Sequence, residues 1–572
     1  MADDGKKKKM AVIGVSSIFL VAMVIAVTVG VSRNGDSGSS GSGDSSSSGG
    51  SGISSSTKAV QALCQPTQYK QTCEESLAGS DSNDPKELIR VGFEAAKKQI
   101  SLALQNSTAL QKLEKDPSAE KALEVCDDVL DLAIDDLAKS FDKLGEFDIS
   151  KVDDYLDDIQ TWLSGSVTYR VTCLDAFENT SSSSKETMEK VLKTAAEINT
   201  NALTMVNQID KLLTTLNIPG ITSRRRLFSE GDSDFPSWVD AGKRRLLEAP
   251  ASEVTPDVVV AQDGSGKYKT LNEALENVPV RKDNRTYVIY VKAGTYKEHV
   301  KIGKKLTHIM MIGDGATKTK FTDNLNYVQG VKTINTATFT VVGAGFICKN
   351  VGFENTAGAI GEQAVALRVA SDTSIFYQCQ MDGYQDTLYA HAHRQFYRDC
   401  TITGTIDFIF GDGAAVFQNC LIQIRKPMDD QQCIVTAQGR TEEGTRTGFV
   451  LQNCTITGAP DYMAVKGQFT SYLGRPWKAY SRTVIMQSQI DDVIDPEGWM
   501  PWAGVTFENT CWYAEFNNRG PGAATTGRVT WPGIKKVQSE DDAAPFTAEE
   551  FLTGNKWITA TNVPYASGMM TV

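Results

Sequence analysis

Histidine is scarce in this sequence, with four occurrences among 572 residues. The pattern Gly-X-Ser-X-Gly, which places a nucleophilic serine on a sharp turn in many hydrolases, does not occur. Zinc-type ligand spacing and a recognition-helix pattern are also missing, and the net charge of −12 argues against a basic surface for phosphates. The sequence therefore argues against a serine hydrolase of this type and against a nucleic-acid partner.

Charge is absent from residues 10–31, which follow four lysines at 6–9. This apolar segment is 22 residues long, enough to cross a hydrocarbon core of about 30 Å with the lysines on the cytoplasmic side. A cleaved signal peptide is the alternative, but its apolar part is usually only about 7–15 residues long. We favour a signal anchor, and either possibility places the chain in the secretory pathway.

The length of the chain suggests several domains. Residues 32–56 are mostly Gly and Ser, which is typical of a flexible linker. Residues 57–215 carry apolar residues at helical spacing, as in Ile89, Phe93 and Ile100, which follow a start signal at Asp84-Pro85. Several such segments with short connections predict an antiparallel four-helix bundle. An even number of cysteines predicts two disulfides within it, from Cys64, Cys73, Cys126 and Cys173.

Residues 216–250 interrupt this pattern with Ser, Gly, Asp and Pro. Two basic clusters occur there, RRRL at 224–227 and KRRLL at 243–247. Exposed basic clusters in a secretory linker are plausible cleavage sites for a processing protease, and a plain solvated loop is the alternative. The presence of two clusters in one short linker favours processing.

Residues 251–572 contain a repeated phrase among short β-branched runs. Its copies are CKNV, YQC, YRDC, FQNC and LQNC, which end at positions 351, 379, 400, 420 and 454. A period near 20 residues without helical pattern indicates a solenoid of β-coils. A sandwich or propeller would show longer and more regular hairpin periods, so we predict a right-handed parallel β-helix.

Four polar residues fall on this repeat. Gln363 lies 22 residues before Gln385, and Asp386 lies 21 residues before Asp407. Residues one period apart in such a solenoid are neighbours at about 4.8 Å. Any one of these residues alone could satisfy backbone groups at a corner. Their common register instead predicts one patch with two amides and two carboxylates.

Two adjacent carboxyls do not ionise equally, so one pKa is expected to rise while the other stays low. Arg475, in the motif YLGRPW with Trp477, follows Asp407 by 68 residues, or about three coils with insertions. If Arg475 pairs with Asp407, Asp407 stays ionised as a nucleophile and Asp386 keeps its proton as a general acid. With two amides as oxyanion donors, the set predicts acyl transfer without serine.

The pair HAH at 391–393 places two histidines on one face of a strand. No third ligand is evident in the sequence, so we predict neither a metal site nor another cofactor.

Five motifs resemble the signature blocks of plant pectin methylesterases: GEQAVALRV, YQDTLYAH, GTIDFIFG, TAQGRT and YLGRPWKAYSRTV. The likeness runs through nearly all of residues 255–572. Residues 57–215 resemble pectin methylesterase inhibitor domains. The whole chain is thus similar to a membrane-anchored or secreted proenzyme with an inhibitor-like pro-region.

The resemblance implies a right-handed parallel β-helix that hydrolyses galacturonyl methyl esters of pectin without a cofactor. Transferred residue by residue, it implies these roles: Asp407 as nucleophile, Asp386 as acid and then base, Gln385 and Gln363 as oxyanion stabilisers, Arg475 as the group that orients Asp407, and Trp477 and Thr333 as substrate contacts.

The resemblance also implies partners and processing. Pectin is the expected substrate, cleavage in the linker would free an enzyme that begins near residues 248–252, and inhibitor proteins are possible partners. The mature enzyme is expected in the extracellular cell wall. The implied disulfides are Cys64 with Cys73 and Cys126 with Cys173.

Seven cysteines remain in the enzyme region, an odd number, so at least one is expected not to pair within it. Adjacent-coil cysteines are candidates for disulfides: Cys379, Cys400, Cys420 and Cys454. Four sequons are candidates for glycosylation: Asn106, Asn179, Asn284 and Asn453.

Two other functions compete with the esterase. A pectic lyase or glycosidase could use the same architecture, but a lyase needs an acidic calcium cluster and a glycosidase needs no paired glutamines. A wall-bound binding or inhibitory protein, active through its bundle, is the alternative from a different class.

Overall fold

The computed structural model describes residues 55–105, 117–145, 152–178, 180, 182–216, 255–281 and 285–571. The chain divides into two compact units, separated between Phe228 and Ser229. Several predicted features lie outside the described residues: the apolar segment 10–31, the linker up to residue 54, both basic clusters, and Asn106, Asn179 and Asn284. Within the described ranges, no helix combines the length and apolar character that crossing a bilayer requires.

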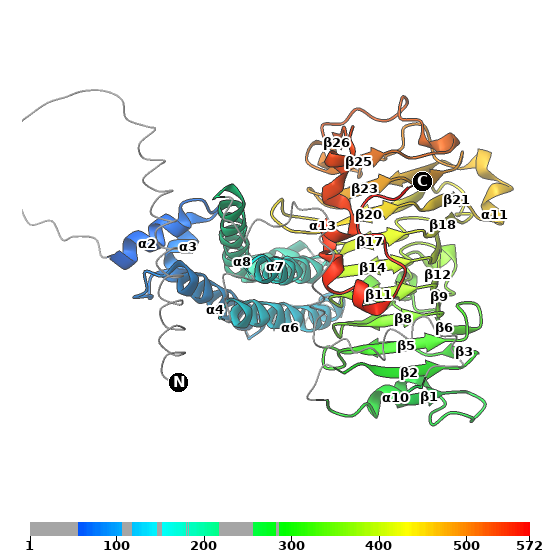
Figure 1. Ribbon diagram of the computed structural model, residues 1–572, viewed down its shortest axis with the longest axis horizontal. Coiled ribbons are helices and arrows are strands. Elements are labelled where there is room, and N and C mark those ends of the chain that lie inside the picture. Colours follow the sequence, from blue (N-terminus) through cyan, green and yellow to red (C-terminus); the bar gives the residue numbers. More distant parts are fainter. Residues whose placement is uncertain are drawn as a thin grey trace, which may run out of the picture. The chain divides into compact units, whose positions relative to one another are not determined.

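The first unit is helical, as predicted (Figure 1). Its helices are α2 (Ser55–Cys64), α3 (Lys70–Leu77), α4 (Pro85–Leu104), α6 (Pro117–Gly145), α7 (Val152–Asp175) and α8 (Ser182–Leu216). The four long helices contact one another in a ring, α4 with α6, α6 with α7, α7 with α8 and α8 with α4.

Helix α4 shows why the sequence is helical here. Asp84 accepts a hydrogen bond from the backbone N–H of Lys86 at 3.0 Å, and Pro85 occupies the first turn, where its missing N–H costs nothing. Ile89, Phe93 and Ile100 then face the core at helical spacing and are buried. The start signal and the apolar stripe are both confirmed.

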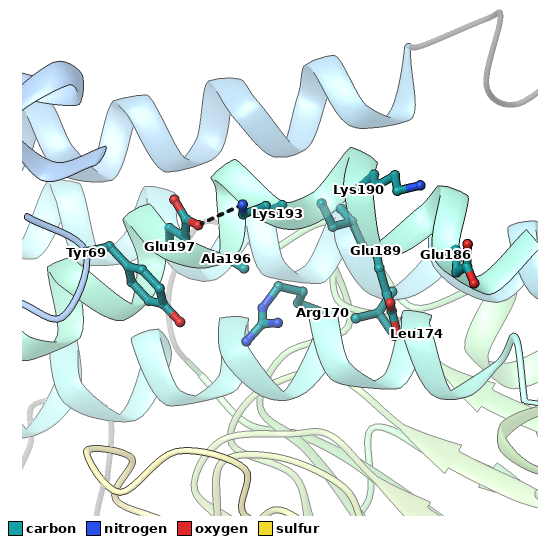
Figure 2. A pocket seen from close by; sticks show the side chains of 10 residues that line it. Tyr69, Arg170, Leu174, Glu186, Glu189, Lys190, Lys193, Ala196 and Glu197 are labelled. Carbon is teal, nitrogen blue, oxygen red and sulfur yellow. Dashed lines mark ion pairs between the residues drawn. The ribbon is translucent and has the colours of Figure 1, made fainter. Parts of the chain in front are cut away.

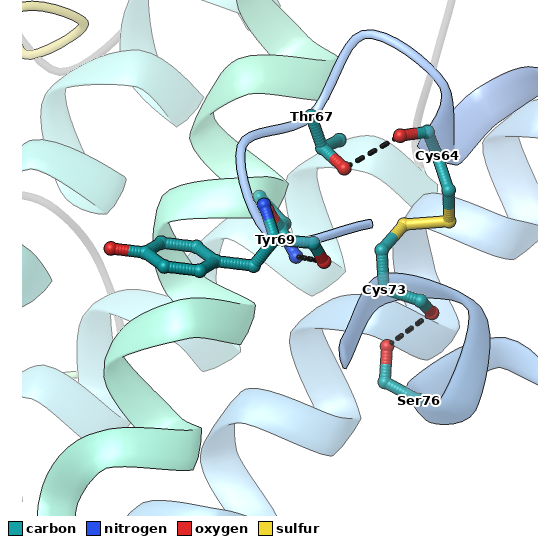
Figure 3. Close-up of a disulfide and its surroundings, with 6 residues drawn as sticks. Cys64, Thr67, Tyr69, Cys73 and Ser76 are labelled. Atoms are coloured by element: carbon teal, nitrogen blue, oxygen red, sulfur yellow. Dashed lines mark hydrogen bonds between the residues drawn. A yellow bond between two sulfur atoms is a disulfide. The ribbon is translucent and has the colours of Figure 1, made fainter. Parts of the chain in front are cut away.

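Two disulfides staple this unit, Cys64 to Cys73 and Cys126 to Cys173. Figure 3 shows the first one, which closes the turn between α2 and α3. Hydroxyl groups finish the helix ends beside it, since Thr67 donates to the carbonyl of Cys64 at 2.7 Å and Ser76 donates to that of Cys73 at 2.8 Å. The turn is therefore fixed both covalently and by hydrogen bonds.

The second unit is a right-handed parallel β-helix, as predicted, with three sheets in which successive coils stack (Figure 1). Sheet 1 contains β1 (Val258–Val260), β2 (Tyr287–Val291), β5 (Ile309–Gly313), β8 (Ile347–Lys349), β11 (Ser374–Tyr377), β14 (Arg394–Arg398), β17 (Ala414–Gln418), β20 (Gly448–Gln452), β23 (Arg482–Met486), β25 (Trp512–Phe516) and β26 (Ile534–Lys535). Sheet 2 contains β3 (Gly294–Lys297), β6 (Thr319–Asp323), β9 (Gly352–Asn355), β12 (Gln380–Asp382), β15 (Thr401–Gly404), β18 (Leu421–Ile424), β21 (Thr455–Gly458) and β24 (Gln489–Ile490). Sheet 3 contains β4 (Val300–Ile302), β7 (Phe339–Val341), β10 (Leu367–Val369), β13 (Leu388–Ala390), β16 (Ile409–Gly411), β19 (Cys433–Gln438) and β22 (Ser471–Gly474).

Rings from successive coils stack inside the helix. Phe376 lies 5.1 Å from Tyr397 between ring centroids, and Tyr397 lies 4.6 Å from Phe417, with nearly parallel planes in both pairs. All three are fully buried. Because like residues recur once per coil, each ring packs on its counterpart, which is why the core is continuous along the axis. Helix α10 (Leu271–Glu276) closes the core beside β1.

The repeated sequence phrase is a corner between sheets 1 and 2. One residue per coil adopts a left-handed conformation there: Asn350, Gln378, Asp399, Asn419, Asn453, Gln487 and Asn517. Asn and Asp tolerate this conformation best among residues with a side chain. The phrase therefore recurs because each coil must turn the same corner.

Four of these corners are followed by a buried cysteine whose thiol donates to carbonyl groups. Cys400 Sγ lies 3.3 Å from the carbonyl oxygen of Phe376, and Cys454 Sγ lies 3.4 Å from that of Phe417. Ser488 continues the row, with its hydroxyl 3.1 Å from the carbonyl oxygen of Leu451. All seven cysteines of this unit are free thiols, so the candidate disulfides between adjacent coils are not formed. The thiols stack to satisfy the backbone rather than to form bridges.

The sequon at Asn453 lies in the same corner row. Its side-chain amide donates to Asn419 Oδ1 at 2.9 Å, and Arg519 donates to Asn453 Oδ1 at 2.8 Å. A glycan would attach to the nitrogen that makes the first of these bonds. Glycosylation of Asn453 would therefore cost a contact between coils.

The outer face of sheet 1 is covered by the C-terminal segment, with α12 (Glu540–Ala543) and α13 (Ala548–Leu552). A row of glutamine side chains binds the part of this segment that follows α13. Gln418 donates to Gln452 at 2.9 Å, and Gln452 donates to Gln487 at 3.0 Å. The same side chains bond the backbone of Ala566, Gly568 and Met570. The last residues of the chain are thus held by side-chain amides.

We expect thiol titration of the denatured chain to find seven free thiols before reduction and eleven after it. Reductant should lower the unfolding temperature of the helical unit, because each lost disulfide costs about 2–5 kcal/mol. The unfolding temperature of the β-helix should not change. Calorimetry of the full chain with and without reductant measures both, and a shift in the β-helix transition would contradict the free-thiol row.

Candidate active site

Two equivalent loops in successive coils lead from sheet 2 into sheet 3. One runs over residues 383–387 before β13, and the other over residues 404–408 before β16. Backbone hydrogen bonds stack them: Thr405 N–H donates to the carbonyl of Tyr384 at 2.8 Å, and Asp386 N–H donates to that of Ile406 at 3.0 Å. Asp386 and Asp407 therefore occupy the same place in neighbouring coils.

Both aspartates adopt the left-handed backbone conformation, with φ of 62° for Asp386 and 50° for Asp407. Such a conformation costs a residue with a side chain about 1–2 kcal/mol. The glycine that opens the second loop has no room for a side chain, since a Cβ at Gly404 would lie 2.2 Å from that of Phe408. The loops are thus tight turns that hold both carboxyl groups in fixed, strained positions.

Arg475 binds the second carboxylate through two hydrogen bonds. Its Nε lies 2.9 Å from Asp407 Oδ1, and its Nη2 lies 2.6 Å from Oδ2. The guanidinium also lies over the ring of Trp502, at 4.4 Å from the centroid. Arg475 directly follows β22, so the solenoid brings it back to Asp407 across 68 residues. Paired donors on both oxygens fix the orientation of this carboxylate.

Both carboxyl groups are buried, with exposed fractions of 7% for Asp386 and 5% for Asp407. Burial raises the pKa of Asp386 well above its usual range, and the negative charge of Asp407 raises it further against the opposing effect of Arg475. Burial also raises the pKa of Asp407, but the charge and hydrogen bonds of Arg475 oppose that rise. The expectation that the pKa of Asp407 stays low is corrected: burial outweighs the guanidinium. The order is as expected, because Asp386 holds its proton more strongly.

The two glutamines pair between the coil of Asp386 and the coil that precedes it. Gln363 and Gln385 form a parallel bridge, and the N–H of Ala364 donates to the carbonyl of Gln385 at 3.2 Å. Gln363 Oε1 is shielded from solvent and has no hydrogen-bond partner. Gln385 directly precedes Asp386, so the amides and the carboxyls occupy three successive coils, with Gln363 before and Asp407 after the coil that carries both Gln385 and Asp386.

The two expected substrate contacts lie on either side of this patch. Thr333 begins the short helix η5 (Thr333–Asn335), and Thr336 ties its end to the coil of Gln363 by accepting from the N–H of Val365 at 3.0 Å. Trp477 lies beyond Arg475 and meets Phe410 edge to face at 6.0 Å.

A row of aromatic side chains was missed in the sequence. Tyr389 and Phe410 stack with centroids 4.2 Å apart, and Trp477 extends the row from Phe410. Tyr389 follows Asp386 by three residues, and Phe410 follows Asp407 by three. The register that pairs the aspartates therefore also pairs these rings, so the signal was present. Neither the repeat nor a motif in the sequence pointed to Trp502 as a neighbour of Arg475.

Both histidines of the HAH motif are buried. His391 Nδ1 accepts from Arg368 Nε at 3.2 Å, and burial lowers the pKa of His391 well below its usual range, with Arg368 adding to the effect. His393 Nδ1 lies 3.2 Å from the carbonyl oxygen of Ala370. In the described part of the chain, no group of three or more His, Cys, Asp or Glu residues is placed to hold a metal ion.

The helical unit contains a pocket of about 550 Å³ (Figure 2). Its wall carries both charges, with Arg170, Lys190 and Lys193 near Glu186, Glu189 and Glu197. The side chains of Lys193 and Glu197 pair at 3.9 Å. The pocket belongs to the helical unit, whereas the aspartate pair belongs to the β-helix.

Comparison with known proteins agrees with this division. The family model described as pectinesterase matches residues 257–555, and that described as plant invertase/pectin methylesterase inhibitor matches residues 58–205. "Probable pectinesterase/pectinesterase inhibitor 21" of Arabidopsis thaliana is 49% identical over 569 residues, which cover 99% of this chain and 83% of the relative. "Probable pectinesterase/pectinesterase inhibitor 58" of the same plant is 48% identical over 577 residues, 99% of each chain.

Among solved structures, the pectin methylesterase from carrot matches with 50% sequence identity and a TM-score of 0.54. The match covers 55% of this chain and 99% of the carrot chain.

We expect Asp407→Asn to lower the pKa of Asp386, because the substitution removes a negative charge that raises it. The pKa should still exceed that of an ordinary aspartate, since burial remains. Titration of carboxyl ¹³C signals, with Asp386→Asn used to assign the resonance, measures the change. An unchanged or higher pKa would show that the two carboxyls are not coupled.

Proposed function

Because this chain belongs to the pectinesterase family and carries a domain of the pectin methylesterase inhibitor family before the enzyme, we propose that Asp407 and Asp386 are its catalytic pair. The chain is a carboxylic ester hydrolase, a pectin methylesterase with an inhibitor-like domain. The bidentate bond between Arg475 and Asp407 carries the proposal, because it separates the roles of two carboxyls that are otherwise alike.

In the first step, ionised Asp407 attacks the carbonyl carbon of a galacturonyl methyl ester. Negative charge develops on the carbonyl oxygen, where the side-chain amides of Gln363 and Gln385 donate hydrogen bonds. Asp386 then gives its proton to the departing methoxy group, and methanol leaves. The product is an anhydride between Asp407 and the galacturonyl group.

In the second step, Asp386, now ionised, takes a proton from water, and the resulting hydroxide attacks the galacturonyl carbon of the anhydride. The bond to Asp407 breaks, which releases the free acid and restores the carboxylate of Asp407. Asp386 again holds a proton. Arg475 keeps Asp407 aimed throughout, and its charge stabilises the carboxylate as leaving group.

The end of the aromatic row supplies a surface for the sugar chain. Trp477 is half-buried and rests edge to face on the buried ring of Phe410, so the ring of Trp477 is the one that can offer an apolar face to a sugar ring. Thr333 contacts the chain from the opposite side. Methanol is the distinguishing product, since a lyase would give an unsaturated sugar and a glycosidase a new reducing end.

We further propose that the chain is a proenzyme. The apolar segment 10–31 directs it into the secretory pathway and anchors it, and a protease cuts at 224–227 or 243–247. The helical unit silences the enzyme or aids its folding until then, and the enzyme acts in the cell wall. The inhibitor-family match of residues 58–205 supports this arrangement. Glycans are proposed at Asn106, Asn179 and Asn284 rather than at Asn453, whose amide is bonded.

Methanol release from highly methylated pectin tests the catalytic pair. We expect activity from the chain cut in its linker, and losses of about 10⁴-fold or more in Asp407→Ala and Asp386→Asn, as for removal of a nucleophile or its proton donor. Asp382→Asn is the matched control, because this aspartate lies four residues from Asp386 but bonds Gln380 and Thr403 instead. Methanol release that survives Asp407→Ala would refute the nucleophile.

Arg475→Gln should move the pH profile of kcat/KM to higher pH. The active form has Asp407 ionised, so activity falls as the pH drops through the pKa of Asp407. Arg475 lowers the pKa of both carboxyls, so its removal raises both and shifts the acid and basic limbs upward. Arg475→Lys should shift the limbs less, since it keeps one charge. Limbs that stay in place in Arg475→Gln would contradict this role.

A further inference from the structure

Two exposed apolar side chains lie on neighbouring loops beside the catalytic amides. Val328, in η4 (Tyr327–Gln329), is 61% exposed, and Ile360, in η6 (Ala359–Gly361), is 76% exposed. The two loops contact each other. Large apolar side chains with more than half of their surface exposed are rare among the described residues, where Val280 is the other example. Exposed apolar side chains at the edge of a site indicate a surface to which an apolar group of the ligand binds.

These loops are held firmly to the coil of Gln363. The N–H of Tyr327, next to Val328, donates to the carbonyl of Gln363 at 2.9 Å. The buried amide of Asn355 donates to the carbonyls of Leu325 at 2.9 Å and Val365 at 3.1 Å, which joins the segment just before η4 to the segment between Gln363 and β10. The exposed pair is therefore fixed in place relative to the amide.

Loop η6 is packed just as closely. A Cβ at Gly361 would lie 2.7 Å from that of Ala357 and 3.2 Å from that of Asn326, so only glycine fits between the loops. Ile360 precedes Gln363 by three residues, which limits the distance between their Cα atoms to about 10 Å. The apolar pair thus lies within the span of a neighbouring sugar when the scissile ester contacts Gln363.

The charge nearby favours a neutral neighbour. Glu362 lies between Ile360 and Gln363 and is exposed. Its carboxylate would repel the free carboxylate of an adjacent, already hydrolysed galacturonate but not a methyl ester. Lys332, the cation on the segment from η4 to η5, is half-buried.

We propose that Val328 and Ile360 bind the methyl ester group of the galacturonate next to the one that is hydrolysed. The enzyme then prefers runs of esterified residues over isolated esters flanked by free acids. This inference rests on the proposed esterase function and adds a specificity that depends on the neighbouring residue.

The test compares the full chain, with and without cleavage in its linker, on pectins of equal length with high and low degrees of esterification. The measured quantity is the ratio of kcat/KM per ester group on the two pectins. In Val328→Ser with Ile360→Ser, we expect this ratio to fall about fourfold, the effect of losing contact with one buried methyl group. Both positions are exposed, so folding should be unaffected, and circular dichroism checks this.

Val280→Ser is the matched control, because Val280 is 97% exposed and lies before β2, several coils from Gln363. Its ratio should equal that of the unaltered chain. In Glu362→Gln, activity on the weakly esterified pectin should rise while that on the highly esterified pectin stays the same.

A ratio that is unchanged in the double variant overturns the inference, and so does an equal fall in Val280→Ser. These outcomes are separable from failure of the proposed function. If the unaltered chain releases no methanol from either pectin, the esterase assignment itself fails. If it releases methanol with a ratio insensitive to the apolar pair, only the neighbour specificity fails.

Discussion

Backbone hydrogen bonds between successive coils are the interaction on which the rest of the structure depends. They fix the distance between equivalent residues at about 4.8 Å and forbid slippage, because a shift by one residue would turn the buried rings outward. The bonds from Thr405 to Tyr384 and from Asp386 to Ile406 are part of this ladder. The carboxyl pair is therefore placed by the scaffold, without a dedicated bond between the two side chains. Glutamines, aspartates and aromatic rings share one spacing for the same reason.

The site keeps two buried carboxyls close together, which is costly for an ordinary interior. Burial disfavours the ionised form of both, and their mutual repulsion adds to this for the second ionisation. The guanidinium of Arg475 bonds Asp407 and lies over the ring of Trp502, so the two carboxyl groups have different surroundings. A single proton can then be shared unequally, which is the condition for one group to act as base or nucleophile while its neighbour acts as acid. The backbone hydrogen bonds between the two stacked loops keep the aspartates from moving apart.

The repeat in the sequence contained the essentials of this geometry, because a solenoid converts sequence spacing directly into spatial neighbourhood. It led to the β-helix, to the meeting of Gln363 with Gln385, and to the pairing of Arg475 with Asp407. The same repeat made disulfides between neighbouring coils look feasible, but the cysteines there are free. Spacing shows that Cys400 and Cys420 are neighbours, but not that each thiol already faces a carbonyl group. Nor could it give the pKa of Asp407, which depends on how completely the loops exclude water. Val328 and Ile360 had no periodic signal, since they lie in insertions between coils.

The glutamine row on sheet 1 has a consequence for the order in which the molecule is completed. Gln418, Gln452 and Gln487 bind the backbone of Ala566, Gly568 and Met570, which are synthesised after every coil of the solenoid. Each coil can stack as it is synthesised, but apolar residues on the outer face of sheet 1, such as Ile375 and Phe396, stay uncovered until the segment that contains α12 and α13 has been made. A chain without residues 540–570 would keep Asp386, Asp407 and Arg475 but would expose the apolar outer face of sheet 1.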